Sequence, residues 1–284
     1  MSGIVRLAIS GFVAFLLLTP ACAGLPEEWK VMNRPVEPFR IAGNLYYVGA
    51  SDIASYLLVT ERGHILIDGG FEETVPLIRT SIESLGFRLE DVKLLLNSHA
   101  HVDHAGGLAR LKELTGATLA ASRGDAPLLE AGGDLWPFSP VKPDRLFDDG
   151  EVLGVGGTDL TAHVTAGHTP GCTTWSARIE GQGKTYDVVF LCSVNVLPGT
   201  DLTSADASFP AGRAAAFARS FEVLESLPAD IFLGAHASFF SMERKRGEKV
   251  VDGANPFVDP DLYRRHIREK KERFEKLLAE QTRP

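Results

Sequence analysis

The chain lacks the basic patches that a protein needs to bind nucleic acid. It carries 29 Lys and Arg against 37 Asp and Glu, which gives a formal net charge of −8. Proteins that bind phosphate backbones draw their affinity from Lys and Arg, so we expect no nucleic-acid partner. The short run ERKRGEK at 243–249 mixes both signs and is expected to be a solvated helix face. With 44% hydrophobic and 23% charged residues, the composition is that of an ordinary globular protein.

An apolar run long enough to cross a membrane is also missing at the N-terminus. Arg6 precedes the apolar stretch 7–18, which is shorter than the roughly 20 residues that a transmembrane helix needs. Ala21-Cys22-Ala23 follows as a small-x-small cleavage site, a pattern typical of an export signal. We therefore expect residues 1–23 to be a signal peptide and residues 24–284 to reach the periplasm without stable membrane insertion. A lipid-modified Cys22 is the alternative.

Cysteine is scarce, and its three positions are Cys22, Cys172 and Cys192. Cleavage after Ala23 leaves two cysteines in an oxidising compartment, which favours one disulfide. The β-rich segments on either side of residues 181–183 support this pairing, because a three-residue hairpin loop would place Cys172 opposite Cys192. Directly opposed Cβ atoms lie about 4.5 to 5.5 Å apart, close to what a disulfide needs.

Repeats, low-complexity tracts and coiled-coil heptads are absent, and the chain alternates strand and helix patterns instead. The predicted strands lie within 44–50, 55–70, 92–96, 118–121, 159–180, 184–193 and 230–236. The predicted helices are 74–85, 108–114, 211–227 and 260–282, with a Gly- and Pro-rich loop at 131–143. The last helix carries an apolar stripe that we expect to pack on a sheet. This alternation indicates a layered α/β architecture. A length of 284 residues allows one large domain or two fused halves.

Imidazole and carboxylate side chains crowd into NSHAHVDHAGG, residues 97–107, directly after a predicted buried strand. His99 and His101 are two residues apart, so an extended segment points them in the same direction. Asp103 and His104 follow where the backbone must turn. These are ligands for a borderline divalent metal, zinc above all, with iron or manganese as rivals.

Two further histidines follow predicted strands, His168 in AGHTPGC and His236 in LGAH. Layered α/β proteins place their sites at such strand ends. We therefore expect two metal sites, one of His99, His101 and His168 and one of Asp103, His104 and His236. Each set leaves a position for water, which is typical of a catalytic site. The remaining histidines, His64, His163 and His266, are expected to have structural roles only.

The H-x-H-x-D-H spacing, followed by GHTPG and a strand-terminal histidine, resembles the signature of the metallo-β-lactamase fold superfamily. Within it the chain is similar to subclass B3 metallo-β-lactamases over residues 44–263, including VDHAGGL, TAHVTAGHTPGCTTWS and NPFVDPDLYRRHI. The resemblance implies a four-layer αββα sandwich, with two mixed β-sheets flanked by helices, in a single domain at 24–284. It also implies two Zn²⁺ ions per chain.

The residues after the DVVF segment narrow the resemblance. Hydrolases of the glyoxalase II kind carry a metal-bridging Asp there, whereas this chain has Leu191-Cys192-Ser193. Subclass B1 enzymes use a Cys there as a ligand, but Cys192 already has an expected disulfide partner, and His104 is present. Similarity to subclass B3 implies that Ser193 helps to hold the substrate carboxylate. Asn195 stands two residues further on, where many relatives carry Ser or Thr.

The resemblance therefore implies a monomeric periplasmic β-lactamase that hydrolyses penicillins, cephalosporins and carbapenems and confers resistance to them. A water shared by two dications loses a proton near neutral pH and becomes the nucleophile. Asp103 is expected to orient that nucleophile and to assist proton transfer to the lactam nitrogen. Two alternatives stay open: an exported hydrolase of another ester, lactone or thioester, and a zinc-binding protein without catalysis. The walls of the pocket, from loops such as 132–143, cannot be placed from the sequence.

Overall fold

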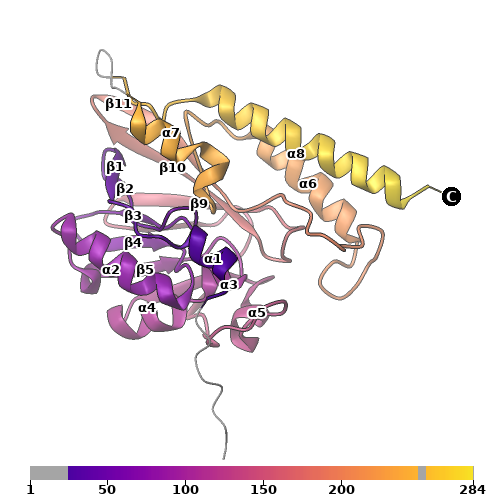
Figure 1. The fold of residues 1–284 in the computed structure, drawn as a ribbon, viewed down its shortest axis with the longest axis horizontal. Helices are drawn as coiled ribbons and strands as arrows, with labels where there is room; N and C mark the ends of the chain where they lie inside the picture. The colour runs from indigo at the N-terminus through magenta and orange to yellow at the C-terminus, as the bar shows by residue number, and fades with distance from the viewer. Residues whose placement is uncertain (1–24, 249–253, 284) are drawn as a thin grey trace, which may run out of the picture.

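The computed structural model describes residues 25–248 and 254–283, so the predicted signal peptide lies outside the described residues. Two sheets pack face to face, and helices cover the outer face of each (Figure 1). This arrangement confirms the expected four-layer αββα sandwich with two mixed sheets. Among the described residues, no helix is both long and apolar enough to cross a membrane.

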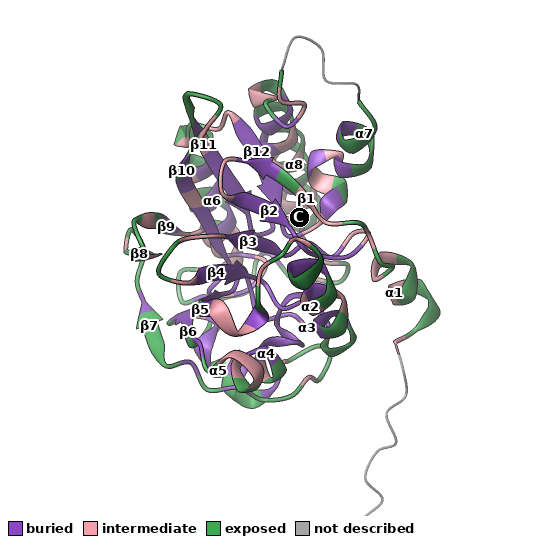
Figure 2. Ribbon diagram, turned by 90° about the vertical axis from the view of Figure 1, so that its left-hand side faces the viewer, coloured by how far each residue is buried: buried purple, intermediate pink, exposed green. Residues whose placement is uncertain are grey.

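The first sheet has seven strands in the order in which they occur in the chain. They are β1 (Phe39–Ala42), β2 (Leu45–Tyr47), β3 (Tyr56–Leu58), β4 (His64–Ile67), β5 (Val92–Leu96), β6 (Thr118–Ser122) and β7 (Arg145–Phe147). Neighbours from β1 to β4 are antiparallel, and those from β4 to β7 are parallel. Successive side chains alternate between the faces of a strand, so Ile65 and Ile67 of β4 face the second sheet while Leu66 faces the outer helices. The central strands β3 and β4 are buried on both faces, whereas the edge strand β7 is largely exposed (Figure 2).

The outer face of the first sheet is covered by two amphipathic helices, α2 (Val75–Ser84) and α4 (Leu108–Thr115). Ile78, Ile82, Leu108 and Leu111 supply their apolar faces and pack with Leu66 in one cluster. The short helix α1 (Glu27–Met32) precedes the first strand, and short helical segments between strands are η1 (Glu72–Thr74), η2 (Leu89–Asp91), α3 (Val102–Ala105) and α5 (Ala126–Ala131).

The second sheet has five strands in the order β12-β11-β10-β9-β8. They are β8 (Val152–Val155), β9 (Thr158–Val164), β10 (Thr173–Gly181), β11 (Lys184–Leu191) and β12 (Ile231–Gly234). Its outer helices, α6 (Arg213–Ser226) and α8 (Pro260–Gln281), lie side by side, with Phe217 against Phe274. Two shorter segments, η3 (Ala237–Phe240) and α7 (Met242–Gly247), follow β12. The predicted stripe of α8 packs as expected: Tyr263, Ile267 and Phe274 are buried.

The predicted register of the β10–β11 hairpin is wrong by one residue. Gly181, not Glu180, pairs with Lys184, so the loop consists of Gln182 and Gly183 alone. Both have positive φ values, 53° and 72°, as a two-residue type I′ turn requires. Gln seldom adopts this conformation, and the GQG sequence therefore suggested a longer loop.

The expectation of a solvated face is only partly met over 243–248, and Lys249 lies outside the described residues. Within α7, Lys245 is buried with a side-chain exposure of 1%, and its Nζ lies 3.8 Å from Asp259 Oδ2. Burial lowers the pKa of Lys245. Its neighbours Arg244 and Glu243 do face solvent. An isolated charge pattern could not reveal Lys245 as a packed residue, because its cover comes from distant parts of the chain.

Candidate metal centre

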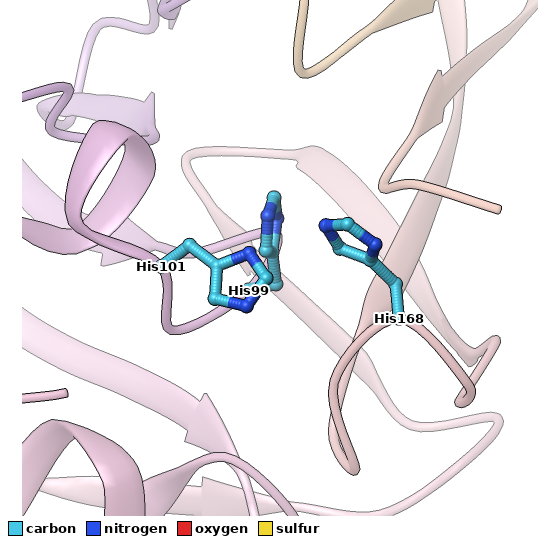
Figure 3. A group of neighbouring side chains, drawn as sticks. All are labelled: His99, His101 and His168. Atoms are coloured by element: carbon cyan, nitrogen blue, oxygen red, sulfur yellow. The ribbon is translucent and has the colours of Figure 1, made fainter. Parts of the chain in front are cut away.

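Three histidines from two separate loops converge on one point (Figure 3). His99 and His101 lie between β5 and α3, and His168 lies between β9 and β10. One ring nitrogen of each lies within 4.8 Å of those of the other two. The loops come together because the sheets meet there: Thr173, which opens β10, donates its backbone N–H to the Ser98 carbonyl at 2.7 Å.

These three imidazoles are held in the neutral form that binds metal. Burial lowers the pKa of all three, and the neighbouring histidines lower it further by charge repulsion. The pKa of His168 falls to about 3. A neutral imidazole offers a free lone pair, so this donor set fits a borderline divalent ion such as zinc.

A second group of donors lies beside the first. Asp103 Oδ2 is 3.1 Å from His104 Nε2 and 3.5 Å from His236 Nε2, and these two nitrogens are 3.3 Å apart. Burial alone would raise the pKa of Asp103, but the charge and hydrogen bond of His104 outweigh it and hold the pKa well below its usual value. Burial alone would lower the pKa of His104, but the carboxylates of Asp103 and Asp68 raise it to about 10. The structure thus brings all six predicted ligands together.

The outer nitrogens of His168 and His236 have hydrogen-bond partners that fix the rings. His168 Nδ1 donates to the Asn195 carbonyl at 2.8 Å, and His236 Nδ1 lies 3.0 Å from Asp52 Oδ2. His104 Nδ1 lies 3.4 Å from Asp68 Oδ2. Such contacts orient metal-binding imidazoles and raise their basicity. The sequence interpretation missed both carboxylates, although Asp68 ends the ILID strand at a position comparable to those of the predicted ligands.

Asp125 joins the two histidine loops and was also missed. Its Oδ2 accepts hydrogen bonds from the backbone N–H of Ala100 at 2.9 Å and from the Thr169 hydroxyl at 2.8 Å. Its Oδ1 accepts from the N–H of Gly171 at 2.6 Å. A Cβ at Gly171 would clash with Ser122 Oγ and with the backbone nitrogen of Asp125, which explains the second glycine of GHTPG. Burial raises the pKa of Asp125 to about 6.

Five of the six donors, all except His104, line a cavity of about 200 Å³ that adjoins a wider cleft of about 600 Å³. The two spaces share His101, Trp136, His168 and Leu197. Trp136, from the loop that the sequence could not place, lies edge-on to Trp29 of α1, which stacks on Phe71. Aromatic side chains therefore form one wall. Ser193 and Asn195, the predicted substrate residues, also line the inner cavity.

The family model described as the metallo-beta-lactamase superfamily matches residues 48–181. The native FEZ-1 metallo-beta-lactamase from Legionella gormanii is 42% identical, with a TM-score of 0.83, over 89% of this chain and 99% of that one. The chain belongs to the metallo-beta-lactamase superfamily. BJP-1, a subclass B3 metallo-beta-lactamase of Bradyrhizobium japonicum, is 37% identical, with a TM-score of 0.82, over 89% of this chain and 98% of that one.

Curated relatives of this superfamily member have broader descriptions. A probable metallo-hydrolase of Burkholderia pseudomallei is 31% identical over 66% of this chain, which spans 63% of that protein's length. A hydroxyacylglutathione hydrolase of Maricaulis maris is 27% identical over 58% of this chain and 68% of that one. Membership of the superfamily thus indicates a metal-dependent hydrolase acting on small molecules. Membership alone does not identify the substrate.

The three remaining histidines of this superfamily member are not among the six donors and contact other residues. His163 Nε2 lies 2.8 Å from Ser176 Oγ across the β9–β10 pair. His64 Nδ1 accepts the N–H of Thr60 at 3.4 Å. His266 packs against Phe232 on the sheet side of α8.

Cys172 and Cys192 form a disulfide in the structure, although the register that suggested it was wrong. Cys172 precedes β10 and Cys192 follows β11, so both lie just outside the regular ladder, with their Cα atoms 5.9 Å apart. Cys172 lies four residues after His168, and Cys192 directly precedes Ser193. The bond therefore ties the loop of a metal-site histidine to a residue of the pocket wall.

Replacing both cysteines by serine is expected to weaken substrate binding more than metal binding. The cross-link closes a separation of 20 residues, which corresponds to at most about 3 kcal/mol of unfolding free energy. Because the β10–β11 ladder persists, we expect zinc stoichiometry to stay the same. We expect KM to rise, because Ser193 is no longer tied to the loop of His168. Steady-state kinetics, elemental analysis and urea unfolding of the double variant measure the three quantities. An unchanged KM would contradict the assigned role.

Proposed function

We propose that this protein is an exported, zinc-dependent β-lactamase that opens the amide bond of penicillins, cephalosporins and carbapenems. The observation that carries the proposal is a set of six metal donors in two adjacent groups, five of which line the inner cavity beside a serine and an amide. Of the described residues lining it, Asp103 is the one acid. Cys192 is held in a disulfide and cannot act as a ligand.

Two Zn²⁺ ions would be held by the two groups of ligands predicted from the sequence. Bound zinc would supply Lewis acidity, activating water near neutral pH and stabilising the charge that develops on the lactam. The protein's own groups supply position and protons. Asp103, ionised at neutral pH, can take a proton from the attacking water and pass that same proton to the departing nitrogen. The Ser193 hydroxyl is buried in the wall, where it can donate to the substrate carboxylate.

A panel of substrates tests this function on the mature protein, residues 24–284. A chromogenic cephalosporin, a penicillin, a carbapenem and a lactone are assayed side by side, with and without a chelator. We expect the β-lactams to be hydrolysed, the chelator to abolish turnover, and added zinc to restore it. Elemental analysis should find two zinc ions per chain in a monomer.

Rapid lactone turnover with no β-lactam turnover would instead support the alternative, a hydrolase of another ester, lactone or thioester. The hydroxyacylglutathione hydrolase among the relatives favours that alternative. Bound zinc with no turnover of any of these substrates would support a binding protein without catalysis.

Export through residues 1–23 is part of the same proposal. Expression of the full chain in a Gram-negative host should yield periplasmic protein whose N-terminal residue is Gly24, and should raise the host's resistance to β-lactams. A mass that shows a lipid on Cys22 would support the alternative anchor. A protein that keeps Met1 would contradict export by cleavage.

A further inference from the structure

A lysine interrupts the apolar stripe of α8 next to the metal centre. Lys270 lies on the same side of the helix as Ile267 and Phe274, at the three- and four-residue spacing that places side chains on one face. It is only partly exposed, and burial lowers its pKa. Its Nζ donates to Asn195 Oδ1 at 2.7 Å and lies 5.7 Å from the centre of the Phe239 ring. Packing alone does not explain a cation in this position.

The contact fixes which way the amide of Asn195 points. An ammonium group has donors and no acceptor, so only the amide oxygen can face it. The amide nitrogen, with two N–H donors, is therefore turned away from Lys270. Among the described residues it has no hydrogen-bond partner, although Asn195 lines the inner cavity. Without the lysine, the amide could rotate and present either its oxygen or its nitrogen to a ligand.

Asn195 and Phe239, the two residues that Lys270 contacts, also contact one donor group each. The backbone carbonyl of Asn195 accepts the Nδ1 hydrogen bond of His168. Phe239, beneath the ammonium group, packs on the ring of His236 at 5.1 Å. The lysine thus holds a residue that faces the substrate space while touching none of the metal donors itself. Its charge is also of the sign that attracts an anion, in a chain whose formal net charge is −8.

We propose that Lys270 is a positioning residue, which locks the amide of Asn195 as a hydrogen-bond donor for the substrate carboxylate. The inference rests on the proposed β-lactamase function, because penicillins, cephalosporins and carbapenems carry a carboxylate beside the lactam nitrogen. Ser193 and Asn195 then bind that carboxylate together. Lys270 sets the affinity for it without contacting it.

The test is K270M, with K271M as the matched control. Methionine keeps an unbranched side chain in the apolar stripe, so the fold and zinc content of K270M should match those of the parent. Lys271 is the next residue and pairs at 2.9 Å with Glu225. We expect K270M to raise KM for a cephalosporin roughly tenfold, the size of one lost charge-assisted hydrogen bond, and to change kcat by less than about twofold. K271M should leave both constants unchanged.

Three further variants and one further substrate separate positioning from a structural role. K270R keeps a donor-only cation and should restore most of the affinity. N195A should raise KM as K270M does, and K270M added to N195A should change it no further. For the methyl ester of the same cephalosporin, which has no carboxylate, parent and K270M should have equal KM values. An unchanged KM for K270M, or an equal rise for acid and ester, would overturn the proposal.

A measurement without turnover distinguishes this inference from the proposed function. The alkali-hydrolysed cephalosporin keeps the carboxylate and cannot react again, so it can be titrated into the zinc-loaded protein. We expect it to shift the Asn195 side-chain amide resonances, assigned with N195A, in the parent and K271M but not in K270M. A parent that shows the shift but hydrolyses no β-lactam contradicts the proposed function alone. A parent that hydrolyses β-lactams without the shift contradicts the role of Lys270 alone.

Discussion

Replacement of Asp103 by asparagine is expected to lower kcat for a β-lactam by roughly 10²- to 10⁴-fold, the range for a lost general acid or base. The amide keeps the size of the carboxylate but carries no charge. It therefore lacks the charge attraction between the Asp103 carboxylate and His104, and it cannot accept a proton from water. Stopped-flow and steady-state assays of the zinc-loaded variant measure the loss.

Asp134→Asn is the matched control for this variant. Asp134 lines the wider part of the same cleft and is exposed, and it makes no contact with the donors of the second group. Its kcat should stay within about twofold of the parent value, since surface charges act weakly through solvent. Zinc stoichiometry must be measured for both variants, because loss of metal alone would also abolish turnover. An Asp103→Asn variant that binds zinc and keeps its kcat would show that another group moves the proton.

The regular part of the fold could be predicted because its residues obey local rules. The strand at 92–96 coincides with β5, and the helix predicted at 74–85 contains α2. Both are buried elements whose apolar residues repeat with the period of their own secondary structure. The strands β7 and β8 were missed because they are short and partly exposed, so their side chains show no clear alternation.

The candidate site could likewise be predicted only in part: its metal donors follow a local sequence pattern, and the partners of these donors do not. The H-x-H-x-D-H cluster is continuous in sequence, and two strand-terminal histidines complete it, so all six donors could be named in advance. Their partners could not. Asp52 meets His236 across 184 residues, and Lys270 meets Asn195 across 75. These contacts exist only after the sheets have packed, and no local pattern records them.

Replacement of Asp125 by alanine is expected to have the largest effect on stability. The carboxylate accepts hydrogen bonds from Ala100, Thr169 and Gly171, and all three donors would be left without a partner in a buried place. Each such group costs about 1 to 3 kcal/mol, so the unfolding free energy should fall by roughly 3 kcal/mol or more. Urea unfolding of the metal-free variant measures this loss apart from any loss of metal.

The same variant should also bind zinc more weakly, although Asp125 is not among the donors. Ala100 stands between two histidines of the first group, and Thr169 follows the third, so the carboxylate sets the distance between the two loops. A zinc titration against a competing chelator should show the loss, with Asp125→Asn intermediate because its amide keeps one acceptor oxygen. Asp144→Ala is the control: this carboxylate also accepts a backbone N–H, that of Leu119 at 2.9 Å, and its other hydrogen bond comes from Lys112, so neither partner belongs to a histidine loop. It should leave zinc affinity unchanged. If Asp125→Ala and Asp144→Ala had equal zinc affinities, Asp125 would be a stabilising residue of the fold and would not be part of the metal centre's support.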